Sequence, residues 1–229
     1  METTVTLHVW RVPARALPRV LVRMAVDRGR LRRHAGVRFA KLLGTGTGDG
    51  FGPGDVDPTR WAAVVVGRAP DGVVDGWRRA SVDHARVDLV PVQSRGTWSG
   101  RAPFTCAAPA RTPDGMVLAL TRARLRPARA VTFWRAVPPV AAALHDAPGL
   151  LARFGIGEAP IGWQGTVSVW RSAADLVAFA YRQPEHRAAV ARTARVGWYA
   201  EELFARFAIS RITGNREVLG WDEMRSRPA

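Results

Sequence analysis

Four stretches in the first half of the chain have the hydrophobic pattern of strands, either alternation with polar residues, as in 4–12, or a short apolar run, as in 60–68. These stretches are also rich in β-branched residues, which favour strands. They are TVTLHVWRV (4–12), VRFAKLLG (37–44), RWAAVVVGR (60–68) and ARVDLVPV (85–92). We expect each of them to form a strand.

Two stretches between these strands have helical spacing instead. Residues 16–33 place arginines between apolar residues that recur at helical intervals, which predicts an amphipathic helix. Those apolar residues are Leu17, Val20, Leu21, Met24 and Leu31. The segment APDGVVDGWRRASVDH (69–84) opens with a turn and continues as a short helix. The order is therefore β-α-β-β-α-β, the ferredoxin-like unit.

The second half of the chain repeats this order. Ser172, followed by Ala-Ala-Asp, is a good helix start, and Pro184 begins a further helix. The expected elements are a strand at 121–128, a helix at 133–146 broken or started at its prolines, a strand pair at 151–160 and 165–172, helices at 172–183 and from 184, and a last strand at 203–212.

The pattern predicts an α+β fold in which tandem ferredoxin-like (βαββαβ) units form a fused dimeric α/β barrel. Residues 1–93 form the first unit and residues 119–229 the second, within one compact domain. Residues 94–118 connect them; this segment is polar and Pro-rich, so we expect it to pack across the surface.

The glycine-rich stretch LLGTGTGDGFGPGD (42–55) is echoed by RFGIGEAP (153–160) in the second half. A phosphate-binding loop needs GxxxxGK[ST] followed by a helix, and a dinucleotide fingerprint also opens a helix. Here no Lys-Ser or Lys-Thr follows, and the next element has a strand pattern. The stretch is therefore interpreted as the turn between two strands and not as a nucleotide site.

The composition is that of an ordinary globular protein, with 47% hydrophobic and 23% charged residues. No apolar run approaches the roughly 20 residues of a membrane span. The first residues, METTVTLHVWRV, lack the features of a signal peptide. The single cysteine, Cys106, excludes an internal disulfide and a zinc-type cluster. We expect a cytoplasmic protein.

The net charge of +15 raises the question of a polyanionic partner. Of the 34 basic residues only Lys41 is a lysine, and the arginines are spread along the whole chain. No recognised nucleic-acid motif accompanies them, so we expect no nucleic acid as partner. A basic face suits an acidic protein partner or peripheral contact with a membrane surface.

Six stretches, in the same order and spanning nearly the whole chain, resemble the spheroidene monooxygenase family of carotenoid biosynthesis. They are FAKLLGTGTGDGF (39–51), SRGTWSGRAPF (94–104), ALTRA (119–123), FWRAVP (133–138), GIGEAP (155–160) and GWYAEELFARF (197–207). The resemblance implies an oxygenase that depends on haem b, takes electrons from a ferredoxin or a similar acidic donor, and places a keto group on a linear carotenoid. It also fits the α/β barrel that several haem enzymes share.

A haem iron needs an axial ligand, usually His, Cys or Tyr. Among the five histidines, His186 is the leading candidate because it lies in the first turn of a predicted helix. From it, Val190, Thr193 and Gly197 follow on one small face that leaves room for a flat macrocycle. The spacing from His186 to Trp198 also resembles the family. We expect His186 to bind the iron, with Val190 and Trp198 beside the haem; Cys106 stays open as a rival ligand.

Two further residues complete the predicted site. Arg122, in ALTRA, can pair with a haem propionate through its planar guanidinium. Glu158, in GIGEAP, is flanked by glycine and is the candidate catalytic residue on the distal side. Glu201 and Glu202 are adjacent on what we expect to be a helix, so they form no acid/base pair. A GxSxG elbow is absent, which argues against a hydrolase.

These observations favour a haem-dependent monooxygenase acting on an apolar substrate, either a carotenoid or another hydrophobic secondary metabolite. Two alternatives stay open, because a fold does not fix a function. The first is a haem-dependent dehydratase or N-oxidising enzyme on a small metabolite. The second is a haem-binding barrel without catalysis. Association into homo-oligomers also stays open.

Overall fold

The computed structural model describes residues 4–48, 53–106, 115–158 and 163–221. Its eight strands form one closed barrel in which all neighbours are antiparallel, in the order β1-β3-β2-β6-β7-β5-β8-β4. The strands are β1 (Val5–Arg11), β2 (Val37–Gly46), β3 (Val56–Gly67), β4 (Asp83–Gly96), β5 (Val117–Leu125), β6 (Leu150–Gly157), β7 (Trp163–Trp170) and β8 (Tyr199–Gly214).

The two halves of the chain contribute four strands each, with the same connectivity. The first half has the order β2-β3-β1-β4, and the second half has the order β6-β7-β5-β8. Two seams join the halves: a short one between β2 and β6, and a long one between β4 and β8. The predicted barrel is thus confirmed as a closed, eight-stranded antiparallel barrel that carries helices.

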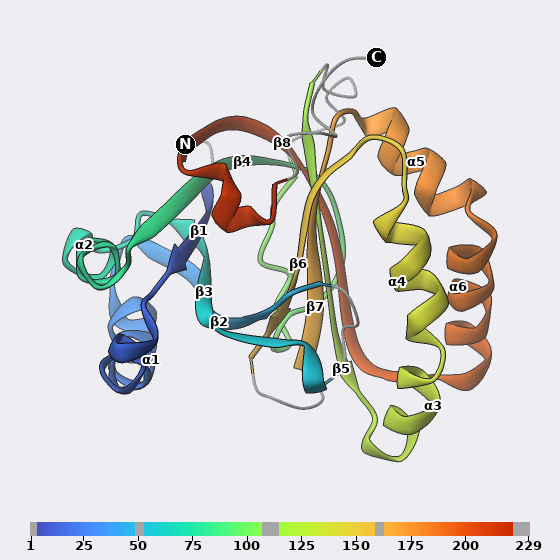
Figure 1. Ribbon diagram of the computed structural model, residues 1–229, viewed down its shortest axis with the longest axis horizontal. Coiled ribbons are helices and arrows are strands. Elements are labelled where there is room, and N and C mark those ends of the chain that lie inside the picture. Colours follow the sequence, from blue (N-terminus) through green and yellow to red (C-terminus); the bar gives the residue numbers. More distant parts are fainter. Residues whose placement is uncertain (1–3, 49–52, 107–114, 159–162, 222–229) are drawn as a thin grey trace.

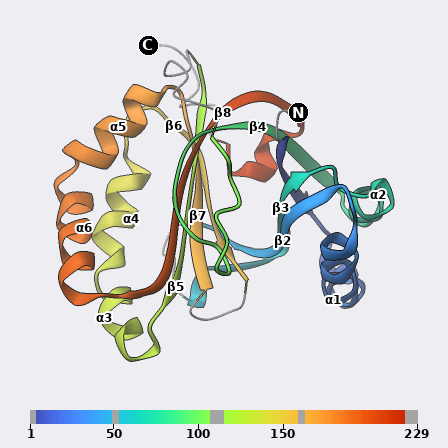
Figure 2. The ribbon, with the colours of Figure 1, turned by 180° about the vertical axis from the view of Figure 1, so that it is seen from behind.

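The helices lie outside the barrel, in two groups on opposite sides of the molecule (Figures 1 and 2). On the side of the first half are α1 (Leu17–Arg33) and α2 (Asp71–Ala80). On the other side are α3 (Ala130–Trp134), α4 (Val137–His145), α5 (Ala173–Arg182) and α6 (Pro184–Val196). As predicted, Ser172 caps α5 by accepting a hydrogen bond from the amide of Asp175.

Apolar side chains fill the interior of the barrel, so the barrel is a packed core. Alternate residues of β1, namely Val5, Leu7 and Val9, point inward, as the strand period requires. The short 3-10 helix η4 (Arg216–Leu219), which follows β8, adds Val218 and Leu219 to the same cluster.

Part of the connecting segment enters the core, so the prediction that it packs across the surface was wrong for Trp98 and Phe104. Trp98 is fully buried inside the barrel, and Phe104 packs edge-on against Phe207 at 4.9 Å. Gly96 permits this path with a φ of +90°, where a Cβ atom would lie 2.1 Å from the carbonyl oxygen of Glu202. Residues 107–114 of this segment lie outside the described residues.

The glycine-rich stretch joins β2 to β3, as predicted, although its residues 49–52 lie outside the described ranges. At Gly46 a Cβ atom would lie 2.6 Å from the carbonyl oxygen of Asp55. Gly48 has a φ of +92°, and a Cβ atom there would lie 3.0 Å from the Cα atom of Phe154. These two glycines therefore allow the backbone to approach other segments of the same chain.

His8 is a buried histidine on the outer face of β1. It is 5% exposed and stacks on Trp10 with a centroid distance of 5.5 Å. Burial, assisted by the nearby charge of Arg86, lowers the pKa of His8 from 6.5 to about 4. The folded protein therefore keeps this imidazole neutral in a range where the unfolded chain binds a proton.

The structure predicts a loss of stability as the pH falls from 6.5 towards 4, because the unfolded state then binds the extra proton. Replacing His8 with Phe, which preserves the stacking, should reduce this loss by up to about 2 kcal/mol. Urea unfolding at pH 7 and at pH 4.5 measures how much unfolding free energy each protein loses on acidification. His34→Phe, at an exposed histidine, is the control. An unchanged pH dependence in His8→Phe would contradict the assignment.

Candidate functional site

The outer face of the second half, beneath its helices, is built from small side chains. Leu118 and Leu120 of β5 point into the barrel core, so Thr121 and Ala123 alternate with them on the outer side. Thr166 of β7 lies directly opposite Thr121. All three outer residues remain half-buried although they belong to a sheet face that carries helices. These three side chains are small, but the larger Phe204 of β8 lies opposite Thr121 on the same face and is also half-buried.

Helix α6 lies outermost over this half and packs against α4 and α5 (Figure 1). None of its described side chains is buried, and Val190 is 56% exposed. In contrast, α1 buries Val20, Met24 and Leu31 against the first half. A surface helix normally buries one apolar face, and the described side chains of α6 depart from this pattern.

His186 lies in the first turn of α6 and is half-buried. Its Nδ1 atom is 2.9 Å from the carbonyl oxygen of Ala180, and its ring lies 5.1 Å from that of Phe179. Phe179 in turn packs against Trp170, on the outer face of β7. The junction of α5 and α6 thus ties the imidazole to the sheet.

The surroundings of His186 favour one neutral form of its imidazole. Burial lowers the pKa of its imidazole, which favours the neutral form. A neutral ring that donates its Nδ1 proton to the Ala180 carbonyl has its lone pair on Nε2. Metal-binding histidines commonly have this arrangement, because the carbonyl fixes both the tautomer and the ring orientation.

Trp198 lies beyond the other end of α6, after Gly197, which ends the helix in a left-handed conformation. It is buried, donates a hydrogen bond from Nε1 to Thr132 at 3.1 Å and packs edge-on against Phe133. Val190 shares α6 with His186. The predicted contact of Val190 and Trp198 with a cofactor stays a prediction.

Glu158 and Arg122 meet inside the barrel, in a buried charge network near one of its ends. Oε1 of Glu158 accepts hydrogen bonds from Nη2 of Arg122 at 2.8 Å and from Nε1 of Trp98 at 2.7 Å. Its Oε2 accepts from Nζ of Lys41 at 2.6 Å. Arg122 also pairs with Glu201, which accepts a further hydrogen bond from the amide of Gly100 at 2.7 Å.

Five of the six stretches that carry the family resemblance each contribute one side chain to this network. The contributors are Lys41, Trp98, Arg122, Glu158 and Glu201. Sequence reasoning missed Lys41, Trp98 and Glu201 as members. A signal was available for one of them, because Lys41 is the only lysine of the chain and interrupts an apolar strand. The expectation that Glu201 and Glu202 lie on a helix was wrong, because both belong to strand β8.

Both carboxylates of the network are held as anions. Burial alone would raise the pKa of Glu201, but hydrogen bonds from Gly100 and Arg122 outweigh it and lower the pKa to about 2. Burial also opposes ionisation of Glu158, yet Lys41 and Trp98 keep the pKa of that carboxyl below its usual range. At neutral pH Glu158 is therefore an acceptor and not a proton donor.

The structure separates the predicted site residues into two groups. Arg122 and Glu158 point into the barrel, whereas His186 lies in the helical layer outside the same sheet. Arg122 is 3% exposed, and both of its carboxylate partners come from the chain itself. The propionate role of Arg122 and the catalytic role of Glu158 stay predictions.

Cys106, the rival ligand, is a free and partly buried cysteine. Burial raises the pKa of its thiol, so the thiolate needed for metal binding is disfavoured at neutral pH. Within the described ranges, no three His, Cys, Asp or Glu side chains gather as metal ligands.

The charge network should be a major source of stability. Glu201→Gln leaves the buried Arg122 with one anionic partner fewer, and we expect a loss of about 2 kcal/mol or more in unfolding free energy. Urea unfolding at pH 7 measures it. Glu202→Gln is the matched control, because Glu202 follows on the outer face of the same strand. Equal losses in the two variants would contradict the assignment.

Comparison with known proteins gives two close relatives along most of the chain. A spheroidene monooxygenase of Rhodobacter capsulatus is 33% identical over 225 residues, which cover 93% of this chain and 91% of that protein. A spheroidene monooxygenase of Rubrivivax gelatinosus is 36% identical over 189 residues, covering 78% of this chain and 71% of that protein. No protein-family model matches the chain.

Among solved structures, an aldoxime dehydratase in complex with butyraldoxime superposes with a TM-score of 0.56. The match covers 90% of this chain and 79% of that chain, at 10% sequence identity. At this identity the likeness concerns the fold alone.

Proposed function

This chain belongs to the spheroidene monooxygenase family, and on that premise we propose that it is a haem-dependent monooxygenase with an apolar substrate. The relatives are oxidoreductases by name, so an enzymatic oxygenase role follows from the family. The further proposal comprises the haem, a ferredoxin as electron donor, and a carotenoid or another hydrophobic secondary metabolite as substrate. The observation that carries it is the geometry of His186.

The residues around His186 suit a haem in three respects. Nε2 is the ring nitrogen left for an iron once Nδ1 bonds to Ala180. Thr121, Ala123 and Thr166 place small side chains on the sheet beneath the helices, next to Phe204 of β8. A haem iron requires only one or two protein ligands. When bound, the haem would supply the activation of dioxygen.

The chain's own residues would bind the haem, orient its histidine ligand and keep water away from that ligand. The Ala180 carbonyl would hold the His186 ring in one orientation, and Phe179 would keep water from one side of it. Arg122 and Glu158 would act from the other face of the sheet. By fixing β5 and the end of β6, they would set the position of Thr121, which neighbours Arg122 in the chain.

The shared strand order supports a second part of the proposal, that the barrel consists of two fused ferredoxin-like units. The two halves differ in which side chains lie between the sheet and its helices. In the first half, Trp77 of α2 stacks on Trp10 at 5.0 Å and also contacts Trp61. In the second half, α6 buries none of its described side chains. We therefore place the haem in the second unit, which contains His186.

The outer surface of α6 suits an acidic electron donor. Three exposed arginines lie along this helix, namely Arg187, Arg192 and Arg195, and its single carboxylate is Glu185 in the first turn. A donor bound there would lie next to the proposed haem. Complementary charge would accelerate its association at low ionic strength.

The first test is the absorption spectrum of the protein reconstituted with haem. We expect a Soret band that is lost in His186→Gly and restored by added imidazole, which can occupy the space of the missing ring. Arg187→Gly is the matched control, because it introduces the same helix-weakening glycine at the neighbouring position. A wild-type protein without a Soret band, or a His186→Gly variant with an unchanged one, would refute the proposed ligand.

The second test identifies the reaction. With a ferredoxin, its reductase and a linear carotenoid, we expect an oxygenated product that carries ¹⁸O from labelled dioxygen, as mass spectrometry would show. Turnover of an aldoxime without reductant and oxygen would instead favour the dehydratase. Tight haem binding without any reaction with dioxygen or peroxide would favour the non-catalytic alternative.

A further inference from the structure

Helix α1 exposes apolar side chains on the face that points away from the barrel. Leu21, Val22 and Val26 are 58%, 65% and 46% exposed, whereas Val20, Met24 and Leu31 of the same helix are buried. Scattered exposed apolar residues are normal on a protein surface, but a cluster on one helix commonly marks an interaction site.

The exposed apolar residues form a continuous line along the helix. With about 100° between successive residues, Pro18, Val22, Ala25 and Gly29 follow at i, i+4, i+7 and i+11. This line lies opposite the buried side of the helix, and Leu21 and Val26 border it. We call these six residues the apolar line of α1.

Arginines flank the apolar line on both sides. One side carries Arg28 and Arg32, and the other carries Arg19 and Arg30. The single carboxylate of α1, Asp27, is buried and paired with Arg23 and Arg30. The exposed surface of α1 is therefore cationic, with no accessible anion of its own.

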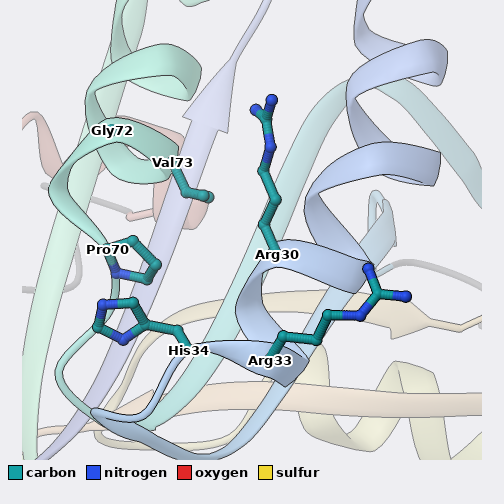
Figure 3. Close-up of a pocket in the computed structure, with 6 residues that line it drawn as sticks. All are labelled: Arg30, Arg33, His34, Pro70, Gly72 and Val73. Atoms are coloured by element: carbon teal, nitrogen blue, oxygen red, sulfur yellow. The ribbon is translucent and has the colours of Figure 1, made fainter.

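A hollow of about 490 Å³ adjoins this surface on the side of α2. Its lining combines basic and small side chains: Arg30, Arg33, His34, Pro70, Gly72 and Val73. In Figure 3, the Arg30 side chain extends between the two helices, while His34 and Pro70 lie side by side at one end. The hollow can receive a small anionic group next to the apolar line.

We propose that the outer face of α1 binds the surface of a bilayer that contains anionic lipids, with the helix lying parallel to the membrane plane. The apolar line would enter the boundary between headgroups and acyl chains. The flanking arginines would reach lipid phosphates, one of which would occupy the hollow. The contact is peripheral: among the described residues no helix is long and apolar enough to cross a membrane.

Three other partners fit this surface less well. Nucleic acid is bound by cations at the centre of the contact, whereas the centre here is apolar. A second copy of the chain would bring arginine rows against each other. An acidic protein would satisfy the arginines, but it would also need an apolar patch of matching length. A bilayer offers anions and an apolar interior together.

This proposal goes beyond the oxygenase proposal and does not depend on it. The outer face of α1 and helix α6 lie on opposite sides of the molecule (Figures 1 and 2). A protein bound to a membrane through α1 would therefore leave α6 accessible to a soluble electron donor.

Sedimentation with lipid vesicles tests the proposal. We expect the full chain to bind phosphatidylcholine vesicles that contain phosphatidylglycerol, to bind pure phosphatidylcholine weakly, and to lose affinity as salt rises. Leu21→Gln/Val22→Gln/Val26→Gln should weaken binding at least about tenfold, because it removes the apolar contact from a helix that it does not destabilise. Arg19→Gln/Arg32→Gln should reduce the salt dependence, because it removes two of the arginines that would reach lipid phosphates.

The matched control is Val56→Gln/Val82→Gln/Val131→Gln, which changes three exposed valines outside α1. It should bind vesicles like the wild type. Thermal unfolding and the Soret band of each variant separate membrane binding from folding and from haem binding. The proposal is overturned by unchanged binding of the α1 triple variant. It is equally overturned if the wild type binds duplex DNA, an acidic protein or itself through this face but not anionic vesicles.

Discussion

Arg122 is a permanent cation inside an apolar barrel, and its neutralisation constrains five of the eight strands. Its two carboxylate partners come from the end of β6 and the start of β8, while Lys41 of β2 and Trp98, just after β4, bind to one of them. A buried guanidinium is tolerated only when anions are fixed around it. The network thus couples the first half of the chain to the second, beside the pair Gly44–Gly157 of the short β2–β6 seam and the pair Gly96–Leu203 of the long β4–β8 seam.

The two halves have similar topology but different packing. Tryptophans fill the space between sheet and helices in the first half, which leaves the outside of α1 as its available surface. The second half places Trp170 and Phe179 between its sheet and helices and holds a neutral histidine at the α5–α6 junction. The two halves thus differ in what their helices present: α1 exposes apolar side chains, whereas α6 carries His186.

Much of the fold was predictable because the relevant signals are local. Alternation located the strands, and Ser172 and Pro184 marked two helix starts that the structure confirms. Helical spacing was less decisive within α1: Leu21 fits the apolar pattern, but the structure exposes it. Adjacent residues point about 100° apart, so Leu21 cannot share the buried line of Val20.

The charge network could not be predicted in the same way. Its members are separated by up to 160 residues of sequence, between Lys41 and Glu201, and nothing local indicates that their side chains converge. The path of Trp98 into the core was equally hidden, because a polar, Pro-rich segment normally lies on the surface. For His186 the sequence indicated the residue and its helix, whereas the carbonyl that orients it became visible only in the fold.

Lys41 has a chemical consequence of its own. It carries the only side-chain amine of the chain, and that amine is bound to Ser99 and Glu158. Acylating reagents that modify lysines therefore have a single side-chain target, and they can react only after its ion pair opens and the amine loses a proton. The rate of acylation at Nζ of Lys41 therefore reports how often this ion pair opens at the end of the barrel.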